Sequence, residues 1–175
     1  ITLNEFQNNP AAVDGRIIGY ANALAMENQF FHWHLEFPEV FSKGGFDVMI
    51  GNPPWERIKL QEKEFFLNRD EEILNAANAA KRKKLIAALE EKNPELYAEY
   101  EKAIKFSNDF SLFIRESNFF SLTAVGDINL YAIFAEHFYN SIRKEGRSGI
   151  VCPTGIATDN NTKDFFAEVV LKNRL

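Results

Sequence analysis

Residues 46–55 read Phe-Asp-Val-Met-Ile-Gly-Asn-Pro-Pro-Trp, and this stretch decides how the rest of the chain is interpreted. Its apolar run, 46–50, lies between two glycines and the sequence Gly-Asn-Pro-Pro, all of which interrupt regular structure. Such a run is typical of a strand buried in a parallel sheet. Ligands of open α/β sheets bind beyond the carboxyl ends of the strands. We therefore expect the functional site at residues 52–55.

The residue types at 52–55 suit the binding of an exocyclic amine. Asn52 offers a side-chain carbonyl, and the fixed angles of Pro53 and Pro54 restrict the directions of the neighbouring backbone carbonyls. Trp55 adds a flat apolar face. Two fixed acceptors can hold an amine such as adenine N6 and increase its electron density while the base stacks on the indole ring. This arrangement favours methylation of the amine.

The sequence Asn52-Pro53-Pro54-Trp55 after an apolar strand resembles the catalytic motif of amino-directed methyltransferases. Residues 126–153 look like the helix and strand that follow the catalytic loop in DNA N6-adenine methyltransferases. The chain is similar in particular to the large single-chain enzymes of restriction-modification and phage-defence systems, because its aromatic segments from Phe31 and Phe37 precede the catalytic strand. The likeness covers residues 31–55 and 126–175.

This resemblance implies a class I, Rossmann-like α/β methyltransferase fold and the transfer of a methyl group from S-adenosylmethionine to a flipped adenine in double-stranded DNA. It assigns the catalytic role to Asn52, Pro53, Pro54 and Trp55, with Asn52 and the Pro53 carbonyl holding the amine. Methyltransferases that act on protein glutamine or on guanine N2 in RNA resemble the same tetrapeptide. A non-enzymatic interaction module, in which residues 52–55 form only a turn, is the alternative from another class.

The glycine-rich donor-binding motif of this family is absent, since no Gly-x-Gly occurs in the chain. The cofactor-binding residues are therefore unknown, and the first residue is Ile1. We interpret the chain as the catalytic half of a longer polypeptide that also holds an N-terminal donor-binding half and a C-terminal target-recognition region. We expect this fragment to be inactive by itself.

Composition limits the other possibilities. With 175 residues, 46% of them hydrophobic and 26% charged, the chain has the composition of about one ordinary globular domain. Its first five residues lack the basic and apolar parts of a signal peptide, and no apolar run is long enough to span a membrane, so we expect a cytoplasmic protein. The net charge of -5 requires that any affinity for DNA come from a local patch. Lys81-Arg82-Lys83-Lys84 is the candidate, although such a run is more often simply solvated.

The remaining pattern is helical, with one further strand. We expect a helix over 11–29, a short strand or irregular packed segment over 30–37, a long helix over 70–91, and a second helix from Asn93 to near Ser117, followed by a break at 121–126. Asp127 is expected to cap a helix that ends at Gly146, before a strand at 148–152 and a last helix from Asn161. This order predicts α/β structure with three parts: 1–55, a helical hairpin insertion over 56–125, and 126–175.

The histidines near residue 33 and the single cysteine are not predicted to form a metal site or a catalytic site. His32 and His34 would share one side of a strand, but no cysteine or third histidine lies near them, so no metal is predicted. The single Cys152 precedes Pro153, whereas cytosine-5 methyltransferases resemble one another in a reactive cysteine that follows proline. We expect the Cys152 thiol to be buried and inert.

Overall fold

The computed structural model describes residues 8–172 and divides the chain into two compact units, 1–44 and 45–175. In the first unit, η1 (Pro10–Ala12) precedes α2 (Gly15–Asn28), which confirms the helix predicted over 11–29. The carboxylate of Asp14 caps α2 by accepting a hydrogen bond from the Arg16 N–H at 2.9 Å.

Residues 30–37 contain no strand, so that part of the prediction is wrong. The segment instead contains the short helix α3 (Trp33–Glu36), and a second short helix, α4 (Pro38–Phe41), follows it. Trp33 and Phe37 are one helical turn apart, and their ring centroids lie 5.9 Å from each other. Pro38 occupies the first position of α4, where its missing N–H leaves no hydrogen bond unmade.

In the second unit, β1 (Phe46–Gly51) pairs in parallel with β2 (Ile142–Ile150), which confirms the predicted strand at 46–50. The second strand begins earlier than the predicted range of 148–152. Gly146 does not end a helix; it lies inside β2, where a Cβ atom would come within 2.7 Å of the Phe46 carbonyl oxygen. Glycine is therefore needed there for the close approach of two backbones.

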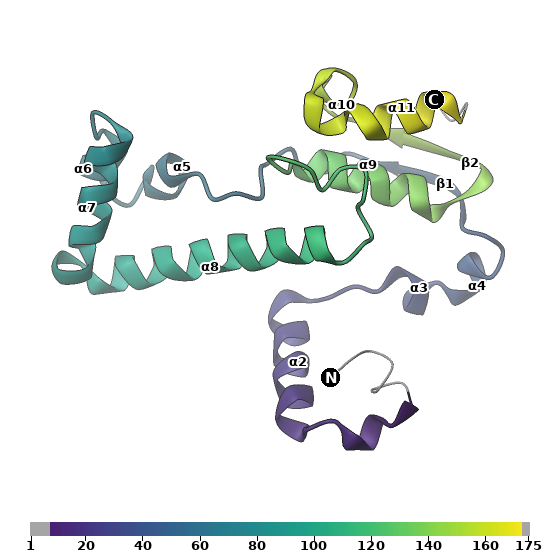
Figure 1. Cartoon of the computed structure of the whole chain (residues 1–175), viewed down its shortest axis with the longest axis horizontal. Coiled ribbons are helices and arrows are strands. Elements are labelled where there is room, and N and C mark those ends of the chain that lie inside the picture. The colour runs from purple at the N-terminus through teal and green to yellow at the C-terminus, as the bar shows by residue number, and fades with distance from the viewer. Residues whose placement is uncertain (1–7, 173–175) are drawn as a thin grey trace. The chain divides into compact units, whose positions relative to one another are not determined.

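Helices cover one face of this sheet. Helix α9 (Leu130–Ser141) leads directly into β2, and α10 (Gly155–Thr158), η2 (Asn160–Thr162) and α11 (Lys163–Leu171) follow it. Ile150 packs against a cluster formed by Ala135, Phe165 and Val169, so α9 and α11 lie against the strands, as Figure 1 shows. On the other face, Val48 and Ile50 are 57% and 80% exposed.

Helix α9 is shorter at both ends than its sequence predicts. Its N-cap residue is Asn129 rather than Asp127, whose carboxylate binds Arg57 instead. The helix ends at Ser141 because Ile142 is already extended, with φ of -82° and ψ of 144°. Sequence pattern favours a helix that continues to the first glycine, whereas Ile142 pairs with Phe46 of β1 and starts the strand that runs to Ile150.

The insertion is helical, as predicted, but its first long helix is broken. It contains α5 (Glu62–Phe66), α6 (Glu71–Leu74), α7 (Ala79–Lys92) and α8 (Pro94–Glu116). Residues 75–78 interrupt the helix expected over 70–91, and the Asn78 side chain starts α7 afresh by accepting a hydrogen bond from the Lys81 N–H at 2.8 Å. The predicted start of the next helix is confirmed, because Asn93 caps α8 and Pro94 occupies its first turn.

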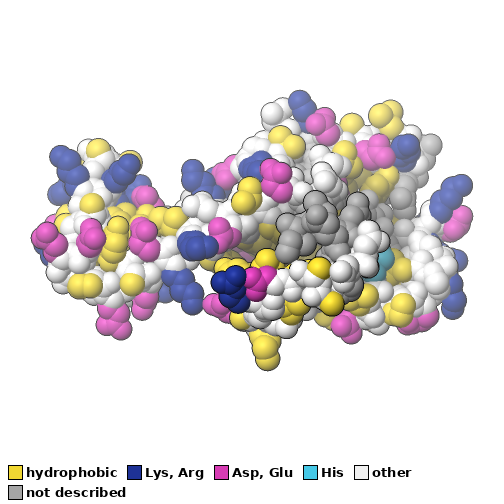
Figure 2. Space-filling model, turned by 60° about the horizontal axis from the view of Figure 1, so that its bottom comes forward, with side chains coloured by type: hydrophobic (Ala, Val, Ile, Leu, Met, Phe, Trp, Pro, Cys, Tyr) yellow, Lys and Arg dark blue, Asp and Glu magenta, His cyan; other side chains and the backbone are white. Residues whose placement is uncertain are grey.

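The insertion has a small core of its own, which we call the insert cluster. Its buried members are Phe66, Ile73, Ile86, Leu89, Leu96 and Tyr100. Phe66 is fully buried, which stabilises the cluster by about 3 kcal/mol. Figure 1 shows α7 and α8 extending away from the sheet, and Figure 2 shows side chains of both charges interspersed over their far end.

Candidate functional site

The loop of residues 52–55, which we call the NPPW loop, leaves the carboxyl end of β1 beside the end of β2. The Gly51 carbonyl accepts a hydrogen bond from the Val151 N–H at 3.1 Å. A Cβ atom at Gly51 would come within 3.0 Å of the Phe138 ring of α9. Glycine therefore lets the strand end pass close to the helix, and this contact fixes where the loop begins.

The chain that leaves the loop is fixed by a short antiparallel pairing with the segment before α9. Leu130 N–H donates to the Glu56 carbonyl at 3.0 Å, and Ile58 N–H donates to the Ile128 carbonyl at 3.1 Å. On the same segment, the Arg57 guanidinium donates to the Asp127 carboxylate at 3.0 Å. The loop is therefore held at both ends by residues that follow it by about 70–100 positions.

The four predicted catalytic residues differ in exposure. Asn52, Pro54 and Trp55 are exposed, whereas Pro53 is buried. In the part of the chain that the structure describes, the Asn52 side-chain amide has no hydrogen-bond partner, so its carbonyl is open to an incoming donor. Trp55 is 52% exposed, so its large apolar ring stays partly in solvent.

A buried carboxylate supports the segment in front of α9. Glu136, 1% exposed, accepts hydrogen bonds from the Leu122 N–H at 3.1 Å, the Thr123 N–H at 2.9 Å and the Thr123 hydroxyl at 2.6 Å. These bonds tie residues 122 and 123 to the middle of α9. The expected break at 121–126 is confirmed, and its position relative to the NPPW loop depends on this carboxylate.

The turn after β2 is packed closely against α9. The Tyr131 hydroxyl donates to the Asp159 carboxylate at 3.4 Å, and burial, with the Asp159 charge second, raises the pKa of Tyr131. A Cβ atom at Gly155 would come within 2.8 Å of the Tyr131 hydroxyl. Cys152 is half-buried rather than fully buried, and its burial raises the pKa of its thiol, which keeps it protonated and unreactive at neutral pH.

The described residues do not provide a complete site for S-adenosylmethionine. A glycine-rich turn between a strand and a long helix commonly holds nucleotide-like groups. Here β1 is followed by the NPPW loop, and β2 is followed by Val151 and the four-residue helix α10. Neither strand of the described residues is therefore followed by a turn of this kind.

Only part of the predicted basic run, residues 81–84, is exposed and unpaired among the described residues. Arg82 pairs with Glu62 at 2.6 Å and its side chain is 15% exposed, whereas Lys81, Lys83 and Lys84 are exposed on α7.

Among residues 8–172 there is no group of three or more His, Cys, Asp or Glu side chains that could hold a metal ion. The His34 ring stacks on Phe41 with centroids 3.8 Å apart. None of the described helices is both long and apolar enough to cross a membrane.

The sequence analysis did not identify the contacts that hold the chain just after the NPPW loop. Arg57 and Lys59 come directly after the loop, and their partners or neighbours lie on α8 and before α9. The available signal was the helical spacing of Ser107, Ser111 and Arg115 on α8. This face of α8 is polar, so the helical spacing of the apolar residues of α8 does not indicate that the face has a role.

Comparison with known proteins identifies one family. The family model for the Eco57I restriction-modification methylase matches residues 2–127, which include β1, the NPPW loop and the insertion. No curated protein and no solved structure gives a match.

Proposed function

Because this chain belongs to the Eco57I restriction-modification methylase family, we propose that it forms the catalytic half of a DNA adenine-N6 methyltransferase. The observation that carries the proposal is the NPPW loop, whose Asn52 side chain and Trp55 ring are exposed together at the carboxyl end of β1. The family assignment favours DNA as substrate over protein glutamine and RNA guanine N2, and favours an enzyme over an interaction module.

In this proposal the target adenine is flipped out of the duplex and stacks on the exposed face of Trp55. The Asn52 side-chain carbonyl and the Pro53 backbone carbonyl accept the two hydrogens of the N6 amine. These two acceptors increase the electron density on the nitrogen and orient it. No side chain is needed as a general base, because the positively charged product amine releases its proton to water.

We propose S-adenosylmethionine as the methyl donor of the intact protein. It would be held by a donor-binding half with the glycine-rich motif that this sequence lacks. The exposed sheet face of Val48 and Ile50 supports such an arrangement, because strands of parallel sheets are usually covered on both faces and an isolated pair of strands is marginally stable. In the proposed Rossmann-like domain, helices would cover this face and further strands would extend the sheet at its edges, and a separate target-recognition region would select the DNA sequence.

The test is methylation of DNA by the full-length protein. Purified protein, S-adenosylmethionine and unmethylated plasmid are incubated, and the digested nucleosides are separated by mass spectrometry. We expect N6-methyladenine in the parent reaction. With Asn52→Ala we expect a loss of at least about 100-fold, as when an active-site hydrogen-bonding group is removed, with stability changed by less than about 1 kcal/mol.

The matched control is Asn68→Ala, which removes another exposed asparagine from the insertion and should methylate like the parent. Methylated cytosine in place of methylated adenine would overturn the adenine assignment and leave the methylase in place. A methylation rate of Asn52→Ala within about twofold of the parent, equivalent to a few tenths of a kcal/mol, would remove Asn52 from the mechanism.

A further inference from the structure

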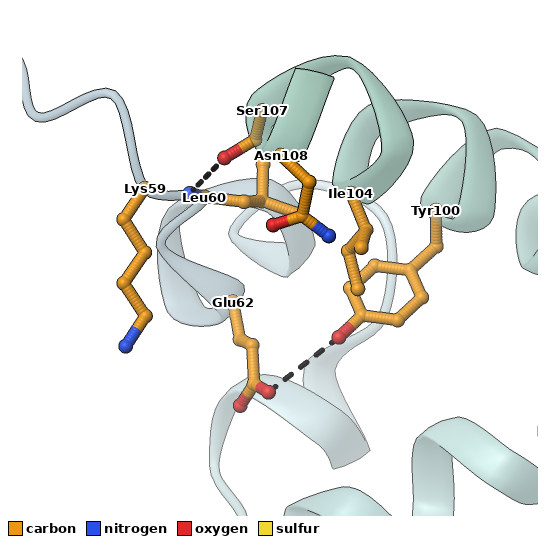
Figure 3. A pocket seen from close by; sticks show the side chains of 7 residues that line it. All are labelled: Lys59, Leu60, Glu62, Tyr100, Ile104, Ser107 and Asn108. Carbon is orange, nitrogen blue, oxygen red and sulfur yellow. Dashed lines mark hydrogen bonds between the residues drawn. The ribbon is translucent and has the colours of Figure 1, made fainter. Parts of the chain in front are cut away.

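Two adjoining cavities lie beside the chain as it leaves the NPPW loop. Their volumes are about 170 Å³ and 150 Å³, and Lys59, Ser107 and Asn108 line both of them. The first also contains Ser111 and Arg115. Figure 3 shows the second, with Lys59 and Asn108 on either side of Leu60. We call this continuous surface, lined by Lys59, Asn108, Ser111 and Arg115, the Lys59 groove.

The buried hydroxyl of Ser107 fixes the position of the chain that forms one side of the groove. Ser107 on α8 accepts a hydrogen bond from the Leu60 N–H at 3.0 Å and donates one to the Ile58 carbonyl at 2.8 Å. Ser107 is 7% exposed. Ser107 therefore holds the backbone on both sides of Lys59 against α8. The Lys59 side chain projects from a fixed position beside the polar face of that helix.

The charge of the groove is positive because its carboxylates are paired elsewhere. Asp127 at one end binds Arg57 at 3.0 Å, and Glu62 at the other end binds Arg82 at 2.6 Å. Arg115 donates to the backbone carbonyls of Ala124 at 2.8 Å and Gly126 at 2.5 Å, which are neutral groups. The charges of Lys59 and Arg115 therefore have no carboxylate partner within the described residues.

The hydrogen-bonding groups of the groove are also available. Among the residues that the structure describes, the Lys59 ammonium, the Asn108 amide and the Ser111 hydroxyl make no hydrogen bond to protein. Pockets for small molecules usually have volumes of about 300–1,000 Å³, so neither cavity is large enough for a nucleoside or a cofactor. Positive charge and free donors in a shallow site are instead typical of contacts to phosphate oxygens.

We propose that the Lys59 groove binds a phosphate group of the DNA backbone near the flipped adenine, an inference that rests on the proposed function. Lys59 follows Trp55 by four positions, so their Cα atoms lie within about 14 Å of each other. That span corresponds to about four nucleotide steps of 3.4 Å along one strand. A duplex whose adenine reaches Trp55 therefore brings phosphates to Lys59, and an acidic chain gains a local basic contact.

The test compares Lys59→Gln with Lys63→Gln in the full-length protein. Lys63 is an exposed lysine on α5 that does not line either cavity. Binding to a duplex that contains the methylated sequence is measured by fluorescence anisotropy between about 50 and 200 mM salt. Loss of one phosphate contact lowers the slope of log K against log salt by about 0.9, and we expect this for Lys59→Gln alone.

A second measurement locates the phosphate. Each phosphate within four nucleotides of the target adenine is replaced in turn by an uncharged methylphosphonate. We expect one replacement to weaken binding by the parent and by Lys63→Gln, and to leave Lys59→Gln unaffected, because the contact is already lost. Asn108→Ala, which removes a neutral donor from the other side of the groove, should weaken binding at the same phosphate with an unchanged salt slope.

The outcomes separate this inference from the proposed function. If the parent methylates DNA while Lys59→Gln keeps the parent's salt slope, or if each methylphosphonate weakens every variant equally, the Lys59 groove is not a phosphate site and the proposed function stands. If the parent methylates no DNA, the proposed function is overturned, and the groove loses its ligand with it.

Discussion

The indole Nε1 of Trp55 donates a hydrogen bond to the backbone carbonyl of Val151 at 3.3 Å, across 96 positions of the chain. Val151 also donates its own N–H to the Gly51 carbonyl at the end of β1. The edge of the ring is thus attached to the end of β2, while about half of the side chain remains exposed. A ring that is already oriented loses little freedom when a base stacks on it, which favours binding.

We expect Trp55→Phe and Trp55→Ala to separate these two properties of the ring. Trp55→Phe keeps an aromatic face and loses the hydrogen bond to Val151, a loss of about 1 kcal/mol. It should retain much of the methylation activity. Trp55→Ala removes the face as well, and should weaken capture of the flipped base by about 1–3 kcal/mol. The measurement is the fluorescence of 2-aminopurine at the target position, in the complex of duplex with full-length protein.

The fold is the control for this comparison. Because the ring is about half exposed, Trp55→Ala should destabilise the protein by less than the roughly 3–5 kcal/mol typical of a core aromatic. Unfolding by that full amount would show that Trp55 serves packing. Base flipping and methylation by Trp55→Ala at the parent's level would equally refute the stacking role.

Glu136→Gln should destabilise the protein although it changes only one atom. The carboxylate accepts three hydrogen bonds, from two N–H groups and one hydroxyl of residues 122 and 123. The amide of glutamine has one oxygen, and its NH₂ group would face donors. We expect a loss of about 2–3 kcal/mol in urea unfolding, whereas Glu145→Gln, which alters an exposed carboxylate of β2, should change stability by less than about 0.5 kcal/mol.

Local sequence signals predicted β1 and the NPPW loop because the information is contained within ten residues. An apolar run between glycines and prolines limits the chain to a short strand that ends at Asn52. The start of α8 was predictable for the same reason, since Asn93 and Pro94 satisfy the first turn of the helix by themselves.

The features that failed depend on contacts between distant segments. The strand begins at Ile142 because that residue pairs with Phe46 of β1, and pairing resumes at Arg147 after an irregularity. Gly146 lies in this irregularity and allows the close approach of the Phe46 carbonyl, rather than ending a helix. The Lys59 groove depends on Ser107, 47 positions after Leu60, so no local pattern near the NPPW loop could reveal it. The NPPW loop is a local feature, whereas the contacts that hold it come from distant segments.

High pH should loosen the insert cluster through Tyr100. Burial, and then the charge of Glu62, raises the pKa of Tyr100 from 10.0 to about 12. Because the folded-state pKa lies above the unfolded value, the neutral phenol contributes stability that is complete below pH 10 and is lost as the pH rises toward 12. We expect a decrease of up to about 2 kcal/mol over this range.

Tyr100→Phe provides the comparison, since it cannot ionise. Urea unfolding of both proteins is measured at intervals between about pH 9 and pH 12, and the difference in free energy of unfolding isolates Tyr100 from the other groups that titrate there. Between about pH 9 and pH 12 the free energy of unfolding of the parent should decrease by about 2 kcal/mol more than that of Tyr100→Phe. A difference that stays constant with pH would show that the phenol of Tyr100 ionises as easily in the folded protein as in the unfolded chain.

The chain of residues 1–175 should bind S-adenosylmethionine weakly when it is studied alone. It contains no Gly-x-Gly sequence, and within residues 8–172 neither β1 nor β2 is followed by a glycine-rich turn. The sheet of the described residues also has only two strands, whereas nucleotide-binding sites of open α/β folds lie between neighbouring strands of a larger sheet. Isothermal calorimetry with the isolated chain should therefore give no saturation at micromolar donor, whereas the full-length protein should bind it. A dissociation constant of about 1 μM or lower, equivalent to about -8.2 kcal/mol, would mean that these residues already form the donor site, and that the division into a donor-binding half and a catalytic half is wrong.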